Sequence, residues 1–278
     1  MIVFPPCKIN LGLNILRQRS DRYHDLETVF YPVGITDILE ITKFKSSAKS
    51  TTIPLTQSGL SIGSESVQNL CTKAYKLLKK DFPKLPFISI HLHKTIPAGA
   101  GLGGGSSDAA YTLKLLNDQF KLKLNTQQLM AYALELGSDC PFFILNQPCY
   151  ATGRGELTEP VAIDLSAYQF LLVYPGIHID TGQAFRSIKP SKPGKPLKEI
   201  LNSPIERWKD DMTNSFEKQA FRQYPEIVDI KDHMYAAGAV YASMSGSGST
   251  VYGIFEKDKK HGLTFPPHYF VKEVSGKA

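Results

Sequence analysis

The chain has 278 residues, 42% of them hydrophobic and 21% charged, which is typical of a folded protein of one large or two modest domains and argues against a disordered chain. It contains no run of about 18 apolar residues, and its first six residues lack the basic start and apolar stretch of a secretion signal. We therefore expect a cytoplasmic protein with no membrane span and no membrane partner.

The net charge of +6 favours anionic partners, but both nucleic acids and small polyphosphates are anionic. The lysines between residues 189 and 198 alternate with prolines rather than with stacking aromatics, as in a solvated surface loop. We therefore expect a small-molecule substrate and no nucleic acid; the sequence carries no signal for an oligomeric state. The four cysteines lack C-x-x-C spacing, which predicts reduced thiols rather than a zinc site or disulfides.

Residues 1 to 44 are expected to form strands, including the alternating segment 38–42. In a strand Lys8 and Asn10 project to one face, although Lys8 alone also fits an ordinary solvated lysine. Residues 46–66 are polar and predict a hairpin or exposed loop. A helix is expected to follow from residue 67 to 78, and Asn69 near its start is compatible either with a ligand contact or with an asparagine facing water.

Residues 87–93 alternate like a half-buried strand, and the apolar residues from Ala109 to Leu116 recur at helical spacing. Between them lies Pro97-Ala98-Gly99-Ala100-Gly101-Leu102-Gly103-Gly104-Gly105-Ser106-Ser107. Glycines let backbone N–H groups converge on an anion, and the N-terminus of the following helix adds its own unpaired N–H groups. This segment, called the glycine loop below, is therefore predicted to bind phosphate.

Two common phosphate-binding motifs fit the glycine loop poorly. A P-loop needs a lysine after its last glycine, but Ser106 follows Gly105. Gly99, Gly101 and Gly104 match the G-x-G-x-x-G pattern of dinucleotide-binding folds, but no second strand ends in an acidic residue about 20 positions further on. A hairpin loop without a ligand is disfavoured, because ordering so flexible a loop costs conformational entropy.

Asn125 and Thr126 can cap a further helix that Gly137 is expected to end from the C′ position. Asp139 follows directly, where it can act as a general base in a cleft or merely cap a turn. Short buried elements are expected at residues 142–144 and 149–152, followed by a turn at 153–155. We place a domain boundary behind this turn, which gives domains 1–158 and 159–278.

The second part reads as a strand at 170–173, a helix near 182–188, helical segments from 216 to 238, and strands at 240–244 and 250–255. The last two strands flank Gly246-Ser247-Gly248, which fits either a hairpin turn or a loop that closes over a ligand. Strands and helices are mixed without regular βαβ alternation, which predicts an α+β fold.

Three segments in order resemble motifs of the GHMP kinases: residues 6–11, the glycine loop with Asp108-Ala109-Ala110, and residues 244–250. The resemblance implies an N-terminal domain like domain 2 of ribosomal protein S5 and a C-terminal ferredoxin-like domain. It also implies an ATP-dependent kinase that uses Mg²⁺. Residues 22–30, 137–143 and 152–156 resemble those members of the family that phosphorylate the 2-hydroxyl of 4-diphosphocytidyl-2-C-methyl-D-erythritol in the non-mevalonate route to isoprenoid precursors.

The resemblance implies roles for individual residues. Lys8 and Asp139 match the catalytic pair, with Asp139 as general base. The positions that match ATP contacts are Asn69, Pro97, Gly99, Gly101, Gly103, Gly104, Gly105, Ser106 and Ser107. The positions that match substrate contacts are Asn10, Tyr23, His24, Asp139 and Phe185. The metal ligands remain open, with Ser107, Asp139 and the phosphates themselves as candidates.

Tyr23 and His24 also fit base recognition on chemical grounds, since proteins read single bases by aromatic stacking and by hydrogen bonds to the base edge. Phe185 matches the family's second stacking aromatic, although a core phenylalanine fits the position as well. Two rival functions stay open at this point. One is a GHMP kinase with a smaller alcohol substrate, and the other is a non-catalytic nucleotide-binding module, for instance for RNA.

Overall fold

The computed structural model describes residues 1–44, 53–61 and 69–276. Strands and helices are mixed, so the predicted α+β class is confirmed. Close contacts divide the chain into two compact units. The first comprises Met1–Cys7, Ile35–Ala98 and Gly103–Gln147, and the second comprises Lys8–Gly34, Gly99–Leu102 and Pro148–Ala278. The chain thus passes between the units several times, and the division at residue 158 stays a prediction.

The first unit contains a four-stranded sheet of order β1-β4-β6-β5. Its strands are β1 (Ile2–Val3), β4 (Ile38–Lys43), β5 (Leu55–Gly59) and β6 (Ile88–Lys94). Alternate residues of β6 are buried, as its sequence pattern predicts. β5 pairs with β6 in parallel, so within the described residues the segment 46–66 contributes a sheet strand instead of a hairpin. The rest of that segment, with Val67 of the predicted helix, lies outside the described residues.

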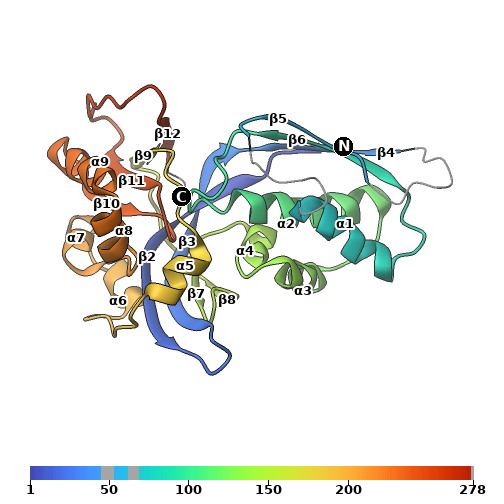
Figure 1. The fold of residues 1–278 in the computed structure, drawn as a ribbon, viewed down its shortest axis with the longest axis horizontal. Coiled ribbons are helices and arrows are strands. Elements are labelled where there is room, and N and C mark those ends of the chain that lie inside the picture. The colour runs from blue at the N-terminus through green and yellow to red at the C-terminus, as the bar shows by residue number, and fades with distance from the viewer. Residues whose placement is uncertain (45–52, 62–68, 277–278) are drawn as a thin grey trace. The chain divides into compact units, whose positions relative to one another are not determined.

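Four helices gather on one face of this sheet (Figure 1). They are α1 (Leu70–Asp81), α2 (Gly104–Phe120), α3 (Thr126–Leu136) and α4 (Cys140–Leu145). Asn125 caps α3, as the sequence predicts. Its partner in a reciprocal capping box is Gln128, which we did not predict. Gly137 ends α3 with extended backbone at the C-cap, not in the C′ position that we expected. The short buried element predicted at 142–144 is the helix α4.

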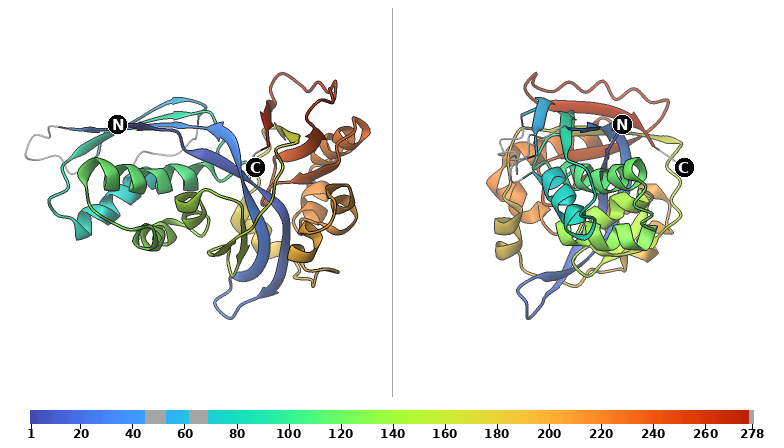
Figure 2. Two further views of the ribbon diagram at one scale, coloured as in Figure 1. Left: turned by 180° about the vertical axis from the view of Figure 1, so that it is seen from behind. Right: turned by 90° about the vertical axis from the view of Figure 1, so that its right-hand side faces the viewer.

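The second unit contains most of the sheet β2-β3-β7-β8. Its strands are β2 (Pro6–Gln18), β3 (His24–Thr36), β7 (Cys149–Thr152) and β8 (Leu157–Pro160). Figure 2 shows β2 and β3 as two long strands side by side. The chain reverses between them at residues 19–23, where the Arg19 amide donates a hydrogen bond to the Tyr23 carbonyl. This reversal positions Tyr23 and His24.

The other sheet of the second unit has the order β10-β11-β9-β12 and is antiparallel throughout. Its strands are β9 (Tyr168–Tyr174), β10 (Tyr241–Met244), β11 (Val251–Glu256) and β12 (Phe270–Ser275). β11 lies between β9 and β10, the split arrangement of a ferredoxin-like domain. Such a domain has a second helix before its last strand, whereas residues 257–269 form a loop here.

Helices and a 3₁₀ turn connect β9 to β10. They are α5 (Thr181–Ser187), α6 (Leu197–Leu201), η2 (Ile205–Arg207), α7 (Trp208–Asp211), α8 (Glu217–Gln223) and α9 (Pro225–Ala236). Ile227, Ile230 and Met234 of α9 join Val251 and Phe255 of β11 in one buried core. This core supports the loop between β10 and β11, which contains Gly246-Ser247-Gly248.

Candidate active site

The backbone of the glycine loop requires glycine at several positions. Gly99, Gly101 and Gly103 have φ values of +66°, +81° and +70°, which residues with side chains rarely adopt. A Cβ added to Gly101 would lie 2.1 Å from the Ser245 carbonyl oxygen. Gly101 therefore lets two backbone segments approach each other more closely than any side chain allows.

Helix α2 begins inside the glycine loop and presents an open N-terminus. Its first intrahelical donor is the Ser107 N–H, bonded to the Gly103 carbonyl at 2.9 Å, so the N–H groups of Gly104, Gly105 and Ser106 come before the ladder. Gly103 has no side chain to cap them, and the first turn holds no acidic residue. This 17-residue helix thus offers its N–H groups and the positive end of its dipole to an anion.

The Ser107 hydroxyl is buried and has no hydrogen-bond partner within the described part of the chain. A hydroxyl in this first turn suits a phosphate or a hard cation. Asn69 is the N-cap of α1, and its side chain accepts a hydrogen bond from the Cys71 N–H at 2.9 Å. It is 8% exposed, so the picture of a helical asparagine facing water is wrong. Pro97 is buried at the start of the loop.

A buried charge cluster lies beneath the start of α2. The Lys94 ammonium donates to the carboxylate of Asp108, at 2.7 Å, and to that of Asp37. Asp37 also accepts from the N–H groups of Thr95 and Ile96, at the end of β6. Burial raises the pKa of Asp108 to about 7, although Lys94 opposes this shift. The cluster joins β6 and the β3–β4 connection to α2, and so fixes the direction of the helix N-terminus.

Lys8 is 3% exposed, so it is not a solvated surface lysine. Its ammonium donates to the Asn10 side-chain oxygen at 2.6 Å and to the Gly101 carbonyl at 3.4 Å, and it lies 4.9 Å from the centre of the Phe30 ring. The Lys8 amide donates to the Leu102 carbonyl at 3.0 Å. Lys8, Asn10 and one segment of the glycine loop therefore meet within the second unit.

Further residues hold this arrangement, and we did not anticipate them from the sequence. The Thr28 hydroxyl accepts from the Asn10 amide at 2.9 Å, and the Tyr252 hydroxyl donates to the Asn10 carbonyl at 2.7 Å. Strand alternation in residues 22–30 could have indicated Thr28. Tyr252 lies 242 positions from Asn10, and no local pattern marks that pairing.

The loop between β10 and β11 packs directly on the glycine loop. The Ser245 hydroxyl donates to the Gly101 carbonyl at 2.9 Å and accepts from the Asn10 N–H at 3.3 Å. The Thr250 N–H donates to the Ala100 carbonyl at 3.2 Å. Residues 245–250 thus form the hairpin connection that was one of the two interpretations of Gly246-Ser247-Gly248, and they support the glycine loop. Closure of this loop over a ligand stays a prediction.

Asp139 is half-buried at the N-terminus of α4, and its side chain makes no capping hydrogen bond to that helix. The thiol of the next residue, Cys140, lies near the Ser106 side chain in the first turn of α2, which lowers the thiol pKa to a smaller extent than burial raises it. Burial raises the pKa of this thiol, so it is an uncharged packing group. Within the first unit, Asp139 therefore lies beside the N-terminus of α2.

The three residues predicted to bind a base form two separate pairs of contacts, one of Tyr23 with Arg154 and one of His24 with Phe185. Tyr23 is 55% exposed, and the Arg154 guanidinium lies 4.9 Å from its ring centre. His24 is buried, with its ring 5.6 Å from that of Phe185, which in turn packs edge-on against Phe216 at 4.9 Å. Phe185 therefore contacts both the core and His24. Tyr23 offers an exposed aromatic surface next to a cation.

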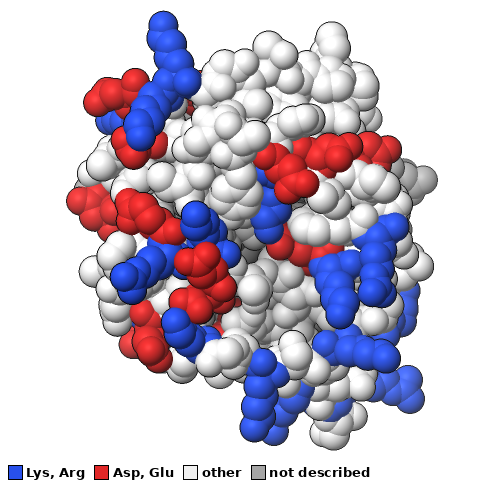
Figure 3. Space-filling model, turned by 90° about the vertical axis from the view of Figure 1, so that its left-hand side faces the viewer, with Lys and Arg blue, Asp and Glu red and all other residues white. Residues whose placement is uncertain are grey.

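Among the described residues, no group of three or more His, Cys, Asp or Glu side chains is arranged to hold a metal ion. No helix in residues 1–44, 53–61 and 69–276 is long and apolar enough to cross a membrane. In Figure 3 acidic and basic side chains lie side by side on the left of the face drawn, whereas basic side chains predominate at its lower right.

Comparison with known proteins identifies the family. The profile of the GHMP kinases N-terminal domain matches residues 69–147, and that of the GHMP kinases C-terminal domain matches residues 197–262. A 4-diphosphocytidyl-2-C-methyl-D-erythritol kinase of Bacteroides fragilis is 52% identical over 94% of both chains. The chain belongs to the GHMP kinase family. A protein of the same name from Bacteroides thetaiotaomicron is 50% identical over 93% of both chains.

Solved structures agree with membership of the GHMP kinases. A crystal structure of a 4-(cytidine 5'-diphospho)-2C-methyl-D-erythritol kinase superposes with a TM-score of 0.78 at 30% identity and covers 99% of this chain and 100% of its own. The mevalonate kinase of Methanococcus jannaschii superposes with a TM-score of 0.73 at 14% identity, covering 100% of this chain and 98% of its own, and shows the shared fold. The predicted two-domain GHMP kinase fold and the predicted kinase activity are confirmed.

Proposed function

We propose that this chain transfers the γ-phosphoryl group of ATP to the 2-hydroxyl group of 4-diphosphocytidyl-2-C-methyl-D-erythritol, in the non-mevalonate route to isoprenoid precursors. One observation carries the choice of substrate: relatives that are 50 to 52% identical over more than nine tenths of the chain are named for it. The family also acts on smaller alcohols, as the mevalonate kinase shows. We further infer a cytoplasmic enzyme.

The nucleotide phosphates are held by the N-terminus of α2. The N–H groups of Gly104, Gly105 and Ser106 precede the helical ladder and are available to phosphate oxygens. Ser107 supplies a hydroxyl, and Asn69, Pro97 and the remaining glycines shape the backbone around the nucleotide. Ser107 and Asp139 are the candidate residues that would hold Mg²⁺, which would supply positive charge for the transfer when bound.

Asp139 and Lys8 carry the chemistry in this proposal. The Asp139 carboxylate accepts the proton of the substrate hydroxyl while its oxygen bonds to phosphorus, which is worth about 10²- to 10⁴-fold in rate. Asp139 lies at the N-terminus of α4, a helix that packs against α2. The Lys8 ammonium, held by Asn10 and Gly101, neutralises the charge that develops on the transferred group.

The cytidine end of the substrate accounts for the aromatic residues. The exposed Tyr23 ring stacks on the cytosine, and His24 bonds to the base edge. Phe185, 5.6 Å from the His24 ring, forms the other side of this base site. The Asn10 side-chain oxygen accepts a hydrogen bond from the Lys8 ammonium. Because Lys8 is placed at the transferred phosphoryl group in this proposal, Asn10 lies close to the acceptor hydroxyl of the substrate.

A panel of acceptors tests the proposal. ADP release is followed with Mg-ATP and each of four alcohols: the cytidine diphosphate ester, 2-C-methyl-D-erythritol 4-phosphate, mevalonate and homoserine. The second acceptor is the matched control, because it carries the same hydroxyl without the cytidine. We expect kcat/KM for the ester to exceed that for the control by at least about 100-fold, as loss of one stacked, hydrogen-bonded base implies. Preference for mevalonate or homoserine would contradict the substrate assignment.

A further inference from the structure

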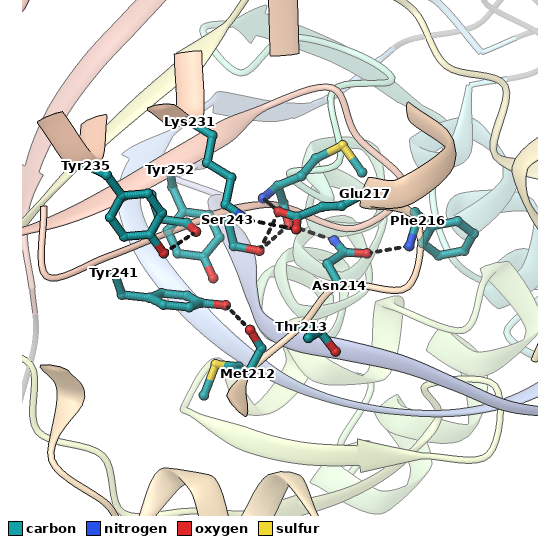
Figure 4. A network of polar contacts seen from close by, with 12 residues as sticks. Met212, Thr213, Asn214, Phe216, Glu217, Lys231, Tyr235, Tyr241, Ser243 and Tyr252 are labelled. Carbon is teal, nitrogen blue, oxygen red and sulfur yellow. Dashed lines mark hydrogen bonds and ion pairs between the residues drawn. The ribbon is translucent and has the colours of Figure 1, made fainter. Parts of the chain in front are cut away.

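Asn214, just before α8, has a buried side-chain amide that forms hydrogen bonds to three backbone groups. It is 4% exposed, and its amide group donates to the carbonyls of Met244 and Gly246, at 2.7 and 2.8 Å. Its oxygen accepts from the Phe216 N–H at 2.9 Å, which fixes the orientation of the amide (Figure 4). Asn214 thus spans the start of the loop that follows β10.

Glu217 holds the same segment from the other side. One of its carboxylate oxygens accepts from the Met244 N–H at 2.9 Å and from the Ser243 hydroxyl at 3.0 Å. The other oxygen accepts from the Lys231 ammonium of α9 at 2.8 Å. Figure 4 shows these side chains converging on one short stretch of backbone. Asn214 and Glu217 therefore bind three backbone groups of two residues, Met244 and Gly246, which lie on either side of Ser245.

The clamped segment reaches the reacting groups through Ser245. The Ser245 hydroxyl donates to the Gly101 carbonyl, which also accepts from the Lys8 ammonium. The residues beside Asn214 are anchored as well, because the Leu13 N–H and carbonyl bond to Thr213 and Ser215, at 2.8 Å each. Leu13 belongs to β2, the strand that carries Lys8. Asn214 therefore ties this strand to the loop on which Gly101 rests.

We propose that Asn214 is a positioning residue for phosphoryl transfer: it fixes Met244 and Gly246 so that the Ser245 hydroxyl holds the Gly101 carbonyl against the Lys8 ammonium. The inference rests on the proposed function. Without the two amide hydrogen bonds, Gly101 and Lys8 lose their fixed separation, whereas the N–H groups of α2 stay in place. Nucleotide binding is then kept while the transfer step slows.

Two variants at Asn214 and one control test this role. Asn214→Ala removes the amide, and Asn214→Asp keeps the size and the acceptor oxygen but loses both donated hydrogen bonds. Lys231→Met is the control, because it removes a 2.8 Å contact to Glu217 in the same network without touching residues 244–246. Turnover of the cytidine ester, ADP affinity and thermal stability are measured for each. Ser245→Ala is expected to behave like the Asn214 variants.

We expect kcat to fall by about 10- to 100-fold in both Asn214 variants, as for a reacting group displaced by a fraction of an ångström or more. ADP affinity should change by less than about threefold, and Lys231→Met should keep kcat within about twofold. Asn214 variants with wild-type kcat would overturn the inference. An equal loss of kcat in Lys231→Met would also overturn the inference, because it would show that the loss of kcat in the Asn214 variants reflects a general destabilisation of the network.

Amide hydrogen exchange gives a readout that does not depend on the substrate. Peptides that cover residues 99–102 and 245–250 should exchange at least about tenfold faster in Asn214→Asp and at the wild-type rate in Lys231→Met. Unchanged exchange in these peptides would overturn the positioning role. A wild-type protein that fails to phosphorylate the cytidine ester would instead contradict the proposed function, and the exchange data would still decide the role of Asn214.

Discussion

Lys8 shows how a single buried charge is kept in place. A buried ammonium is unfavourable unless polar groups surround it. Here the Asn10 oxygen, the Gly101 carbonyl and the face of the Phe30 ring provide that environment. Lys8 therefore has a defined position before any substrate binds, which is what electrostatic stabilisation of a transferring phosphoryl group requires.

Replacement of Asp139 by asparagine separates catalysis from binding. Asp139→Asn removes the proton acceptor, so we expect kcat to fall by about 10²- to 10⁴-fold. Stability should change little, because asparagine has the same size as aspartate and keeps one side-chain oxygen as an acceptor. ADP release and ADP affinity are measured beside those of Asp118→Asn, the same change at an exposed residue of α2 in the same unit. Full activity of Asp139→Asn would exclude its role as the base.

The buried cluster of Lys94, Asp37 and Asp108 makes stability depend on pH. Burial raises the pKa of Asp108 from its ordinary value of 3.8 to about 7. Between these values the folded chain holds a proton that the unfolded chain has released, so the free energy of unfolding falls as the pH rises from about 4 to about 7. Asp108→Asn lacks this titration.

Urea unfolding at pH 5 and pH 8 measures the effect. The wild type should lose on the order of 2 kcal/mol more than Asp108→Asn between these two pH values. The two proteins share the titrating groups outside this cluster, so the difference between them reports the titration of Asp108 together with its coupling to Asp37 and Lys94. Parallel pH profiles would show that the carboxyl group of Asp108 is ionised throughout this range.

At the scale of elements, the two parts of the glycine loop, the segment before α2 and the first turn of α2, respond differently to the replacement of glycine by alanine. A methyl group at Gly101 meets the Ser245 carbonyl and requires a positive φ, so Gly101→Ala should destabilise the chain by about 1–3 kcal/mol. At Gly105, in the first turn of α2, the nearest atom would lie 4.0 Å away. Gly105→Ala should therefore be neutral or stabilising by up to about 1 kcal/mol. Equal stability of the two variants in denaturant would contradict this difference.

Elements with strong local signals could be predicted from the sequence. The alternation of residues 87–93 predicted a strand close to the observed bounds of β6, and the cap at Asn125 predicted the start of α3. β12 was missed because it is mostly exposed and is defined by pairing with β9, about a hundred residues away. Gly137 ends α3 as expected, but the prediction that it would occupy the C′ position was wrong. Its φ of 165° is extended backbone that any residue can adopt.

At the scale of the whole molecule, ligand binding and folding are coupled. A nucleotide that binds only the folded chain adds about 2.7 kcal/mol to its stability at 100 times the dissociation constant. For a chain of this size the midpoint of thermal unfolding should rise by about 5–8 °C with ADP. Adenosine, which lacks phosphates, should give a much smaller rise, and equal shifts would show that the glycine loop does not bind phosphate.

The resemblance of residues 6–11, of the glycine loop and of residues 137–143 to family motifs predicted Lys8, the phosphate-binding loop and Asp139, but not the contacts that hold them. Lys8, Gly101 and Ser245 come from segments about 90 and 140 residues apart, and a carbonyl shared by two donors has no sequence pattern. Asn214 has no local pattern that distinguishes it from any other asparagine before a helix. Such supporting contacts become visible only when the chain is folded.

Phosphorus NMR of the complete reaction tests the central claim most directly. The chain is mixed with Mg-ATP and 4-diphosphocytidyl-2-C-methyl-D-erythritol, and the phosphorus resonances are followed over time. We expect the γ-phosphate signal of ATP to be replaced in equal amount by one new phosphomonoester signal, with the diphosphate bridge of the ester intact. Appearance of inorganic phosphate in place of the phosphomonoester, or persistence of ATP, would contradict phosphoryl transfer to this substrate.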